Sequence, residues 1–123
     1  KAERWWRNNR QPMRTSRLAL FEAENTIRRM RVAQKITADE EHHALESMRR
    51  GLFEGFIELW EVPVRRLYPD ARRLSLHNNK IKSYGAMDIL HVASALDMRC
   101  DLLLTFDDAQ SELARAEGLK APL

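Results

Sequence analysis

The chain has 123 residues and is 44% apolar, which is enough for one compact hydrophobic core but not for two separate domains of ordinary size. Its single cysteine, Cys100, cannot form an intrachain disulfide, so nothing points to an oxidising compartment and we expect a cytoplasmic protein. No apolar run approaches the roughly 20 residues that span a bilayer, and no apolar segment near the start resembles a signal peptide. We therefore expect a soluble protein with no membrane contact.

The net charge of +3 is unevenly distributed along the chain. Residues 1–35 hold ten lysine or arginine side chains against three glutamates, whereas acids outnumber bases in the rest of the chain. A basic segment followed by an acidic one is consistent with a flank that binds polyanions beside a site built from carboxylates. It is also the pattern of ordinary solvated helix faces, and charge alone favours this simpler interpretation.

The N-terminal third of the chain is predicted to be helical. Residues 1–9 resemble the end of a helix. Thr15 or Ser16 can cap a second helix, because a hydroxyl in this position accepts a hydrogen bond from the first helical turn. Apolar residues then recur at helical spacing, and the length of the pattern predicts an end near Lys35.

The middle of the chain is predicted to contain a helix, a strand and another helix. Thr37 and Glu40 form a capping box, which marks the start of the first of these helices. Its expected buried residues are Ala44, Leu45, Met48 and Leu52. Residues 56–62 alternate apolar and polar side chains up to Pro63, as in a short strand. The following helix is expected to end at the Asn78-Asn79 pair.

The C-terminal third is predicted to form a helix, a strand and a helix. Apolar spacing favours a helix over residues 88–98, and the continuous apolar run 102–104 is typical of a buried parallel strand. A last helix begins at Asp107 or Asp108 and ends at Gly118, a residue suited to a left-handed C-cap. This order of elements predicts an α/β layer structure.

Several carboxylates lie at the edges of these apolar segments. Asp107 follows a predicted strand, and ligands of open α/β sheets bind at that end. Asp88, Asp107 and Asp108 could each be ordinary helix-capping residues. Glu22 is harder to explain, because it lies near the apolar face of its helix, and a buried carboxylate needs a partner or a cation. Converging acids would repel one another unless Mg²⁺ or Mn²⁺ lay between them, and we expect Thr105 to orient one of them by a hydrogen bond.

The segment "EEHHALE" offers a competing metal site. His42 and Glu46 are one helical turn apart, but the helix is otherwise polar on this side and no third ligand is evident nearby. Surface exposure is the simpler interpretation. The chain also contains no HExxH zinc motif, no glycine-rich phosphate loop and no GxSxG nucleophile motif. These absences leave the carboxylates as the main candidates for chemistry.

Three segments together resemble the PIN-domain nucleases, in particular VapC-type toxins of bacterial toxin–antitoxin pairs. They are "TSRLALFEAEN", "MDILHVASAL" and "LLLTFDDAQSELARAEGL". The resemblance implies a three-layer α/β/α fold with a central parallel sheet, formed by one domain over residues 1–123. It also implies that Glu22, Asp88 and Asp107 are the metal-binding and catalytic acids, with Glu22 rather than Glu24 in the matching register. The remaining residues that it implies are Asp108 as an additional acid, with Thr105 and Asn25 in support.

The same resemblance implies a function. PIN-domain toxins cleave RNA with one or two divalent ions, here Mg²⁺ or Mn²⁺, and an antitoxin covers the acidic site. A homodimer is frequent in the family. The arginine-rich helices toward the N-terminus would then hold phosphates that flank the cleaved bond.

Two departures from the family pattern leave alternatives open. The family normally begins with a strand that ends in an Asp, and no such strand is present, so we expect an N-terminally incomplete domain that lacks one metal ligand. Gly85 replaces a basic residue that related sequences often carry. A noncatalytic PIN-like interaction module is therefore the alternative function. A phosphate-accepting receiver domain is more remote, because no matching lysine follows a final strand.

Overall fold

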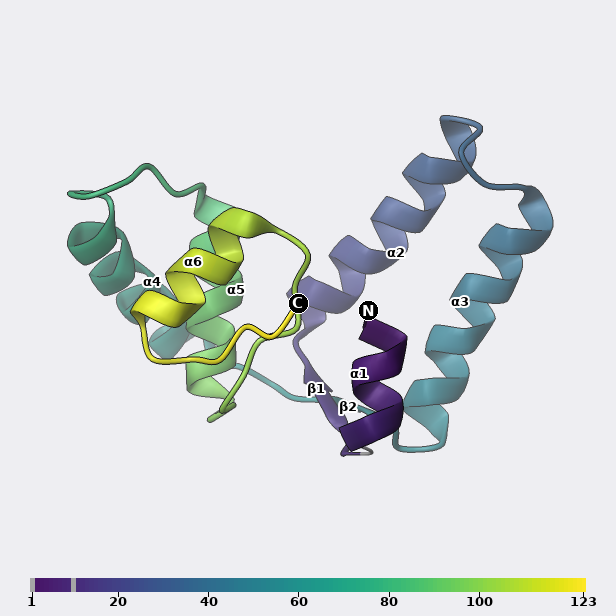
Figure 1. Cartoon of the computed structure of the whole chain (residues 1–123), viewed down its shortest axis with the longest axis horizontal. Coiled ribbons are helices and arrows are strands. Elements are labelled where there is room, and N and C mark those ends of the chain that lie inside the picture. The colour runs from purple at the N-terminus through teal and green to yellow at the C-terminus, as the bar shows by residue number, and fades with distance from the viewer. Residues whose placement is uncertain (1, 10) are drawn as a thin grey trace. The chain divides into compact units, whose positions relative to one another are not determined.

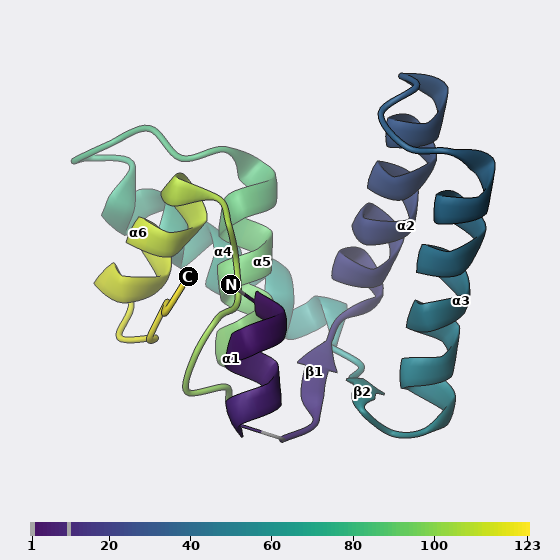
Figure 2. The same cartoon turned by 45° about the vertical axis from the view of Figure 1, so that its right-hand side comes forward.

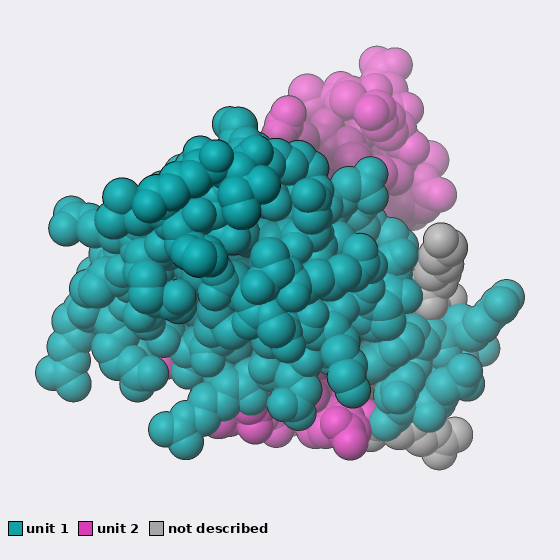
Figure 3. Space-filling model, turned by 60° about the vertical axis from the view of Figure 1, so that its left-hand side comes forward, with its two compact units in different colours: residues 1–9, 62–123 teal, residues 10–61 magenta. Residues whose placement is uncertain are grey.

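The computed structural model describes residues 2–9 and 11–123, and most of these residues are helical (Figure 1). The chain forms two units, which Figure 3 colours separately. Unit 1 contains residues 1–9 and 62–123, and unit 2 contains residues 10–61. None of the described helices is both long enough and apolar enough to span a membrane.

Unit 2 is a helical hairpin with a small sheet at its base. Helices α2 (Arg17–Val32) and α3 (Ala38–Phe53) lie side by side in both views (Figures 1 and 2). Strands β1 (Met13–Thr15) and β2 (Ile57–Leu59) pair in parallel, with Met13 opposite Ile57. The sheet has these two strands only among the described residues. The sequence predicted β2 within residues 56–62, but it did not predict β1.

Both helix starts in unit 2 confirm the predicted caps. The Ser16 hydroxyl accepts a hydrogen bond from the Ala19 N–H at 3.1 Å. At α3 the Thr37 hydroxyl accepts from the Glu40 N–H at 3.1 Å, and the Glu40 carboxylate accepts from the Thr37 N–H at 2.7 Å. These bonds satisfy N–H groups that a helix start leaves without intrahelical partners. Local sequence alone therefore fixes where these two helices begin.

Unit 1 holds the hydrophobic core. It contains α1 (Ala2–Asn9), α4 (Val64–Asn78), α5 (Ala86–Asp97) and α6 (Asp108–Ala116). Helix α5 packs against both α4 and α6. Its apolar residues are buried almost all round, as expected for a helix with neighbours on two sides. The core cluster consists of Ala71, Leu74, Ile89, Val92, Ala93, Ala95, Leu113, Ala114 and Leu119.

The end of α6 matches the predicted glycine cap. Gly118 has a φ of +88°, in the left-handed region that glycine adopts without a Cβ penalty. Its N–H donates to the Arg115 carbonyl, and the Leu119 N–H donates to the Ala114 carbonyl. These two bonds form a Schellman motif, and the apolar contact it favours joins Leu119 to the core.

Three expectations about packing need correction. Residues 102–104 do not form a buried strand: Leu102 makes a single parallel bridge to Lys120, and all three leucines are half-buried. The described part of the chain shows no sheet beyond the two strands of unit 2. The expected buried residues of α3, Ala44, Leu45, Met48 and Leu52, are half-buried rather than buried, and Ser16 alone is buried among the described residues of unit 2. The molecule is thus helix-rich α/β with a small parallel sheet, which is consistent with a PIN-like fold.

Candidate functional site

Two of the predicted acids lie at the starts of helices in unit 1. Asp88 is the third residue of α5, after the N-cap Gly85. Asp107 is the N-cap of α6, and its Oδ1 accepts a hydrogen bond from the Gln110 N–H at 2.9 Å. A carboxylate near a helix N-terminus is stabilised by the helix dipole. The starts of α5 and α6 therefore place both acids.

Gln110 connects these two acids. Its backbone N–H donates to Asp107, while its side-chain Nε2 donates to Asp88 Oδ1 at 3.2 Å. The Thr105 hydroxyl donates to Gln110 Oε1 at 3.1 Å and accepts from the Asp107 N–H at 3.1 Å. Asp88, Thr105 and Asp107 therefore belong to one hydrogen-bonded group, in which the Thr105 hydroxyl contacts the Asp107 backbone and the Gln110 side chain rather than a carboxylate. Gln110 is a member that the sequence analysis missed.

A signal for Gln110 was present in the sequence. Asp107 followed three positions later by Gln110 matches the spacing of a capping box, whose third residue normally returns to the N-cap backbone. In this chain the side-chain nitrogen of Gln110 instead donates a hydrogen bond to Asp88 of α5. The local pattern could have identified Gln110 as a capping residue, but only tertiary structure links it to Asp88.

A hollow of about 520 Å³ opens beside this group in unit 1. It is lined by Thr105, Phe106, Asp107, Asp108, Ser111, Glu112, Arg115 and Leu123. Asp108, the predicted additional acid, is exposed in the first turn of α6. The Arg115 guanidinium donates to the Ala121 carbonyl at 2.6 Å, which holds a positive charge at the wall of the hollow. The hollow thus presents carboxylates and one ordered cation to solvent.

The other predicted residues belong to unit 2. Glu22 is half-buried on α2, and Asn25 is exposed three positions later on the same helix. Glu24 forms an ion pair with Arg28 at 3.4 Å, one helical turn away. Glu24 therefore has a local ion-pair partner, and the family resemblance implies a chemical role for Glu22 rather than for Glu24.

The residues of unit 1 fit a divalent cation in the chemistry of their donors. Carboxylate oxygens are the ligands preferred by Mg²⁺ and Mn²⁺. A methyl group on Gly85 would lie 3.2 Å from Asp88 Oδ2, so the absence of a side chain there leaves room beside that oxygen. Within residues 2–9 and 11–123, however, no group of three or more His, Cys, Asp or Glu side chains could hold a metal ion.

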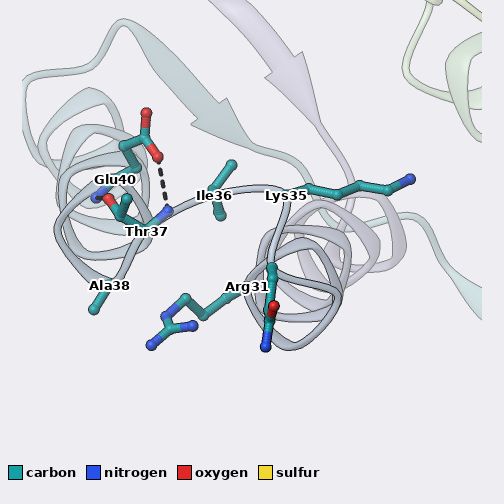
Figure 4. A pocket seen from close by; sticks show the side chains of 7 residues that line it. Arg31, Lys35, Ile36, Thr37, Ala38 and Glu40 are labelled. Carbon is teal, nitrogen blue, oxygen red and sulfur yellow. Dashed lines mark hydrogen bonds between the residues drawn. The ribbon is translucent and has the colours of Figure 1, made fainter.

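The competing features of unit 2 are of a different kind. His42 is exposed, and Glu46 forms an ion pair with Arg49 at 2.9 Å. A second hollow, of about 370 Å³, lies where α2 turns into α3 (Figure 4). It is lined by Arg31, Gln34, Lys35, Ile36, Thr37, Ala38 and Glu40. The one carboxylate in this hollow, Glu40, is already bonded to the Thr37 backbone. Neither feature resembles the acidic group of unit 1.

Comparison with known families decides the affiliation of the chain. The sequence profile of the PIN domain matches residues 1–116. The chain belongs to the PIN-domain family. PIN domains are typically nucleases that depend on divalent metal ions. A search of curated proteins finds no significant relative of this PIN domain.

Proposed function

We propose that this PIN domain is a metal-dependent endoribonuclease that hydrolyses phosphodiester bonds of RNA as the toxin of a toxin–antitoxin pair. The observation that carries the proposal is the hydrogen-bonded group around Gln110, which joins Asp88 and Asp107 beside an open hollow. The family match supports the reaction class. The resemblance of the three sequence segments to VapC-type toxins supports the biological role, an antitoxin as protein partner, and a cytoplasmic location.

The proposed roles of the residues follow from their chemistry. Glu22, Asp88 and Asp107 hold Mg²⁺ or Mn²⁺, Asp108 adds negative charge, and Thr105 and Asn25 orient the acids. When bound, such a cation activates a water molecule and offsets the charge that develops on the scissile phosphate. Arginines of the N-terminal half bind flanking phosphates without reading sequence.

We also propose that both units are parts of one PIN domain spanning residues 1–123. The family match supports this, because residues 1–116 include parts of both units. The three-layer α/β/α arrangement with a central parallel sheet remains the architecture that we expect for that domain. Parallel strands β1 and β2 would belong to its central layer.

A second candidate function is a noncatalytic PIN-like interaction module. The observation that favours it is the set of large apolar side chains exposed on the helical hairpin of unit 2. Phe21, Val32 and Phe53 are 64%, 84% and 91% exposed, respectively. Apolar side chains gathered on a surface often mark a protein interface. An antitoxin or a second copy of the chain would also use such a surface, so activity must distinguish the two functions.

RNA cleavage tests the proposal. We expect labelled single-stranded RNA to be cut by the chain in Mn²⁺ or Mg²⁺ and not in excess EDTA. Asp88→Asn should reduce the rate by roughly 100-fold or more, because the change removes a charged ligand without changing side-chain size.

Asp101→Asn is the matched control for this experiment, because Asp101 is an exposed acid of unit 1 outside the hydrogen-bonded group. Its cleavage rate should equal that of the parent chain. Cleavage that persists in EDTA or in the Asp88→Asn variant contradicts the proposed nuclease. Absence of cleavage by the parent chain, together with retained partner binding, supports the interaction module instead.

A further inference from the structure

We propose that the hollow of unit 1 is a nucleotide subsite, in which an unpaired RNA base stacks on Phe106 and the Arg115 guanidinium binds the adjoining phosphate. The inference rests on the proposed function, because the bound nucleotide belongs to the RNA substrate. It gives roles to two residues that have none in the proposed function, and it makes a single strand the substrate class. Every contact that carries it lies within unit 1.

Phe106 is held in solvent at the edge of the hollow. It is 72% exposed, although Leu103, three positions earlier, packs against the hydrophobic core. The Asp107 N–H donates to the Thr105 hydroxyl at 3.1 Å, and Asp107 is the N-cap of α6. These contacts fix the backbone on both sides of Phe106. A ring presented by a fixed backbone stacks on a base with little loss of conformational freedom.

The wall of the same hollow carries Arg115, whose guanidinium is held in place but retains unused donors. One of its terminal nitrogens donates to the Ala121 carbonyl at 2.6 Å. A guanidinium has five N–H donors, and that of Arg115 makes no other hydrogen bond or ion pair with the residues that the structure describes. The remaining donors can bind phosphate oxygens, which match the planar fork of arginine.

The size and lining of the hollow suit a nucleotide. Its volume of about 520 Å³ lies within the range of about 300–1,000 Å³ that is usual for small-ligand sites. Its lining combines an exposed ring and a cation with the hydroxyl-bearing Thr105 and Ser111. Single-stranded RNA is held by the same combination of aromatic stacking and positive charge. Because a base inside a duplex is already stacked on both faces, the subsite selects an unpaired one.

The carboxylates of the hollow are largely occupied by other contacts. Glu112 forms an ion pair with Lys82, and Asp107 accepts a backbone N–H at the start of α6. Asp108 is exposed in the first turn of α6, where the helix dipole offsets part of its charge. A phosphate bound in the hollow therefore meets less repulsion than three unpaired acids would exert.

RNA binding without cleavage tests the stacking role. The dissociation constant of a short, fluorescein-labelled single-stranded RNA is measured by fluorescence anisotropy in excess EDTA, where the proposed nuclease is inactive. Phe106→Leu should raise the dissociation constant about 10-fold, because stacking of the base is lost. Phe106→Tyr keeps the ring and should bind like the parent chain. Tyr68→Leu removes another exposed ring of unit 1, outside the hollow, and should leave the dissociation constant unchanged.

An abasic nucleotide shows whether Phe106 contacts a base. The abasic nucleotide is moved through the RNA one position at a time. At one position it should weaken binding by the parent chain about 10-fold and have no further effect on Phe106→Leu, because the two partners of one contact are coupled. A merely structural role of Phe106 would weaken the binding of every RNA equally and would single out no position.

Salt dependence tests the phosphate contact. The logarithm of the affinity for a single strand falls with the logarithm of the salt concentration, with a slope of about 0.7 for each phosphate contact. Arg115→Gln should reduce this slope by about one contact. Arg72→Gln makes the same change at an exposed arginine of α4 and should not change the slope.

The failures of the two proposals can be told apart. If the parent chain cleaves RNA but Phe106→Leu and Arg115→Gln bind it like the parent chain, the subsite is wrong and the proposed nuclease stands. If the parent chain binds RNA through Phe106 but does not cleave it in Mn²⁺ or Mg²⁺, the nuclease fails and the subsite stands. A parent chain that binds no RNA overturns the subsite.

Discussion

At the scale of single residues, Asp97 is the most unusual acid of unit 1. Its side chain is 7% exposed, and its Oδ1 lies 3.4 Å from an Arg66 guanidinium nitrogen. Its Oδ2 is buried and accepts no hydrogen bond from the described residues. Burial raises the pKa of Asp97, the nearby Asp70 carboxyl group raises it further, and the Arg66 guanidinium opposes the rise. Folding therefore favours the protonated form of this acid.

This raised pKa predicts how stability depends on pH. A protonated Asp97 stabilises the fold fully below the ordinary pKa of 3.8, and this stability is lost as pH rises through the raised folded-state pKa. Asp97→Asn mimics the protonated acid, so it should flatten that part of the pH profile and stabilise the neutral-pH fold by about 1 kcal/mol. Urea unfolding at several pH values measures both effects. Asp101→Asn should leave the profile unchanged, and an unchanged profile in Asp97→Asn would contradict the assignment.

The acids and their partner also show how far sequence predicts a site. The positions of Asp88 and Asp107 at helix starts were predictable, because they follow from local apolar periodicity. The contact of Thr105 with this group was expected from its neighbouring position. The bond from Gln110 to Asp88 was not predictable, because it joins residues 22 positions apart on two helices. Such a contact depends on how α5 and α6 pack.

At the scale of elements, the helix starts in unit 2 were predicted because their signals are local. The bonds of Ser16 and Thr37 lie within four residues of each cap. The strand β1 was missed because three residues carry too little pattern, and its pairing with β2 spans more than 40 positions. Residues 102–104 were wrongly predicted as a strand because apolar content alone does not supply a backbone partner. In the described part of the chain, the backbone pairing of this run is limited to the bridge between Leu102 and Lys120, where the Leu103 N–H donates to the Lys120 carbonyl.

The capping box of α3 provides a direct test at this scale. Thr37→Ala should lower the free energy of unfolding by about 1 kcal/mol, because the Glu40 N–H loses its acceptor. Thermal unfolding followed by circular dichroism measures the effect. Thr26→Ala, the same change inside α2 at an exposed position, should be neutral or slightly stabilising, since alanine favours helices. Equal effects of the two substitutions would show that the box contributes no stability.

At the scale of the whole molecule, the predicted acids are divided between the two units. Glu22 belongs to unit 2, whereas Asp88 and Asp107 belong to unit 1. The PIN-domain match includes residues of both units. The proposed nuclease function assigns these acids to one divalent cation. This claim predicts that the acids depend on one another in binding that cation.

A double-mutant cycle of Mn²⁺ binding tests this claim most directly. Glu22→Gln and Asp88→Asn should each weaken Mn²⁺ binding by about 10-fold or more. Because residues that share one ion are coupled, the loss of binding free energy in the double variant should be smaller than the sum of the two single losses. Glu24→Gln, which changes the neighbouring acid on α2, should leave the affinity unchanged. Normal Mn²⁺ affinity in Glu22→Gln, or strictly additive losses in the double variant, would contradict a shared site.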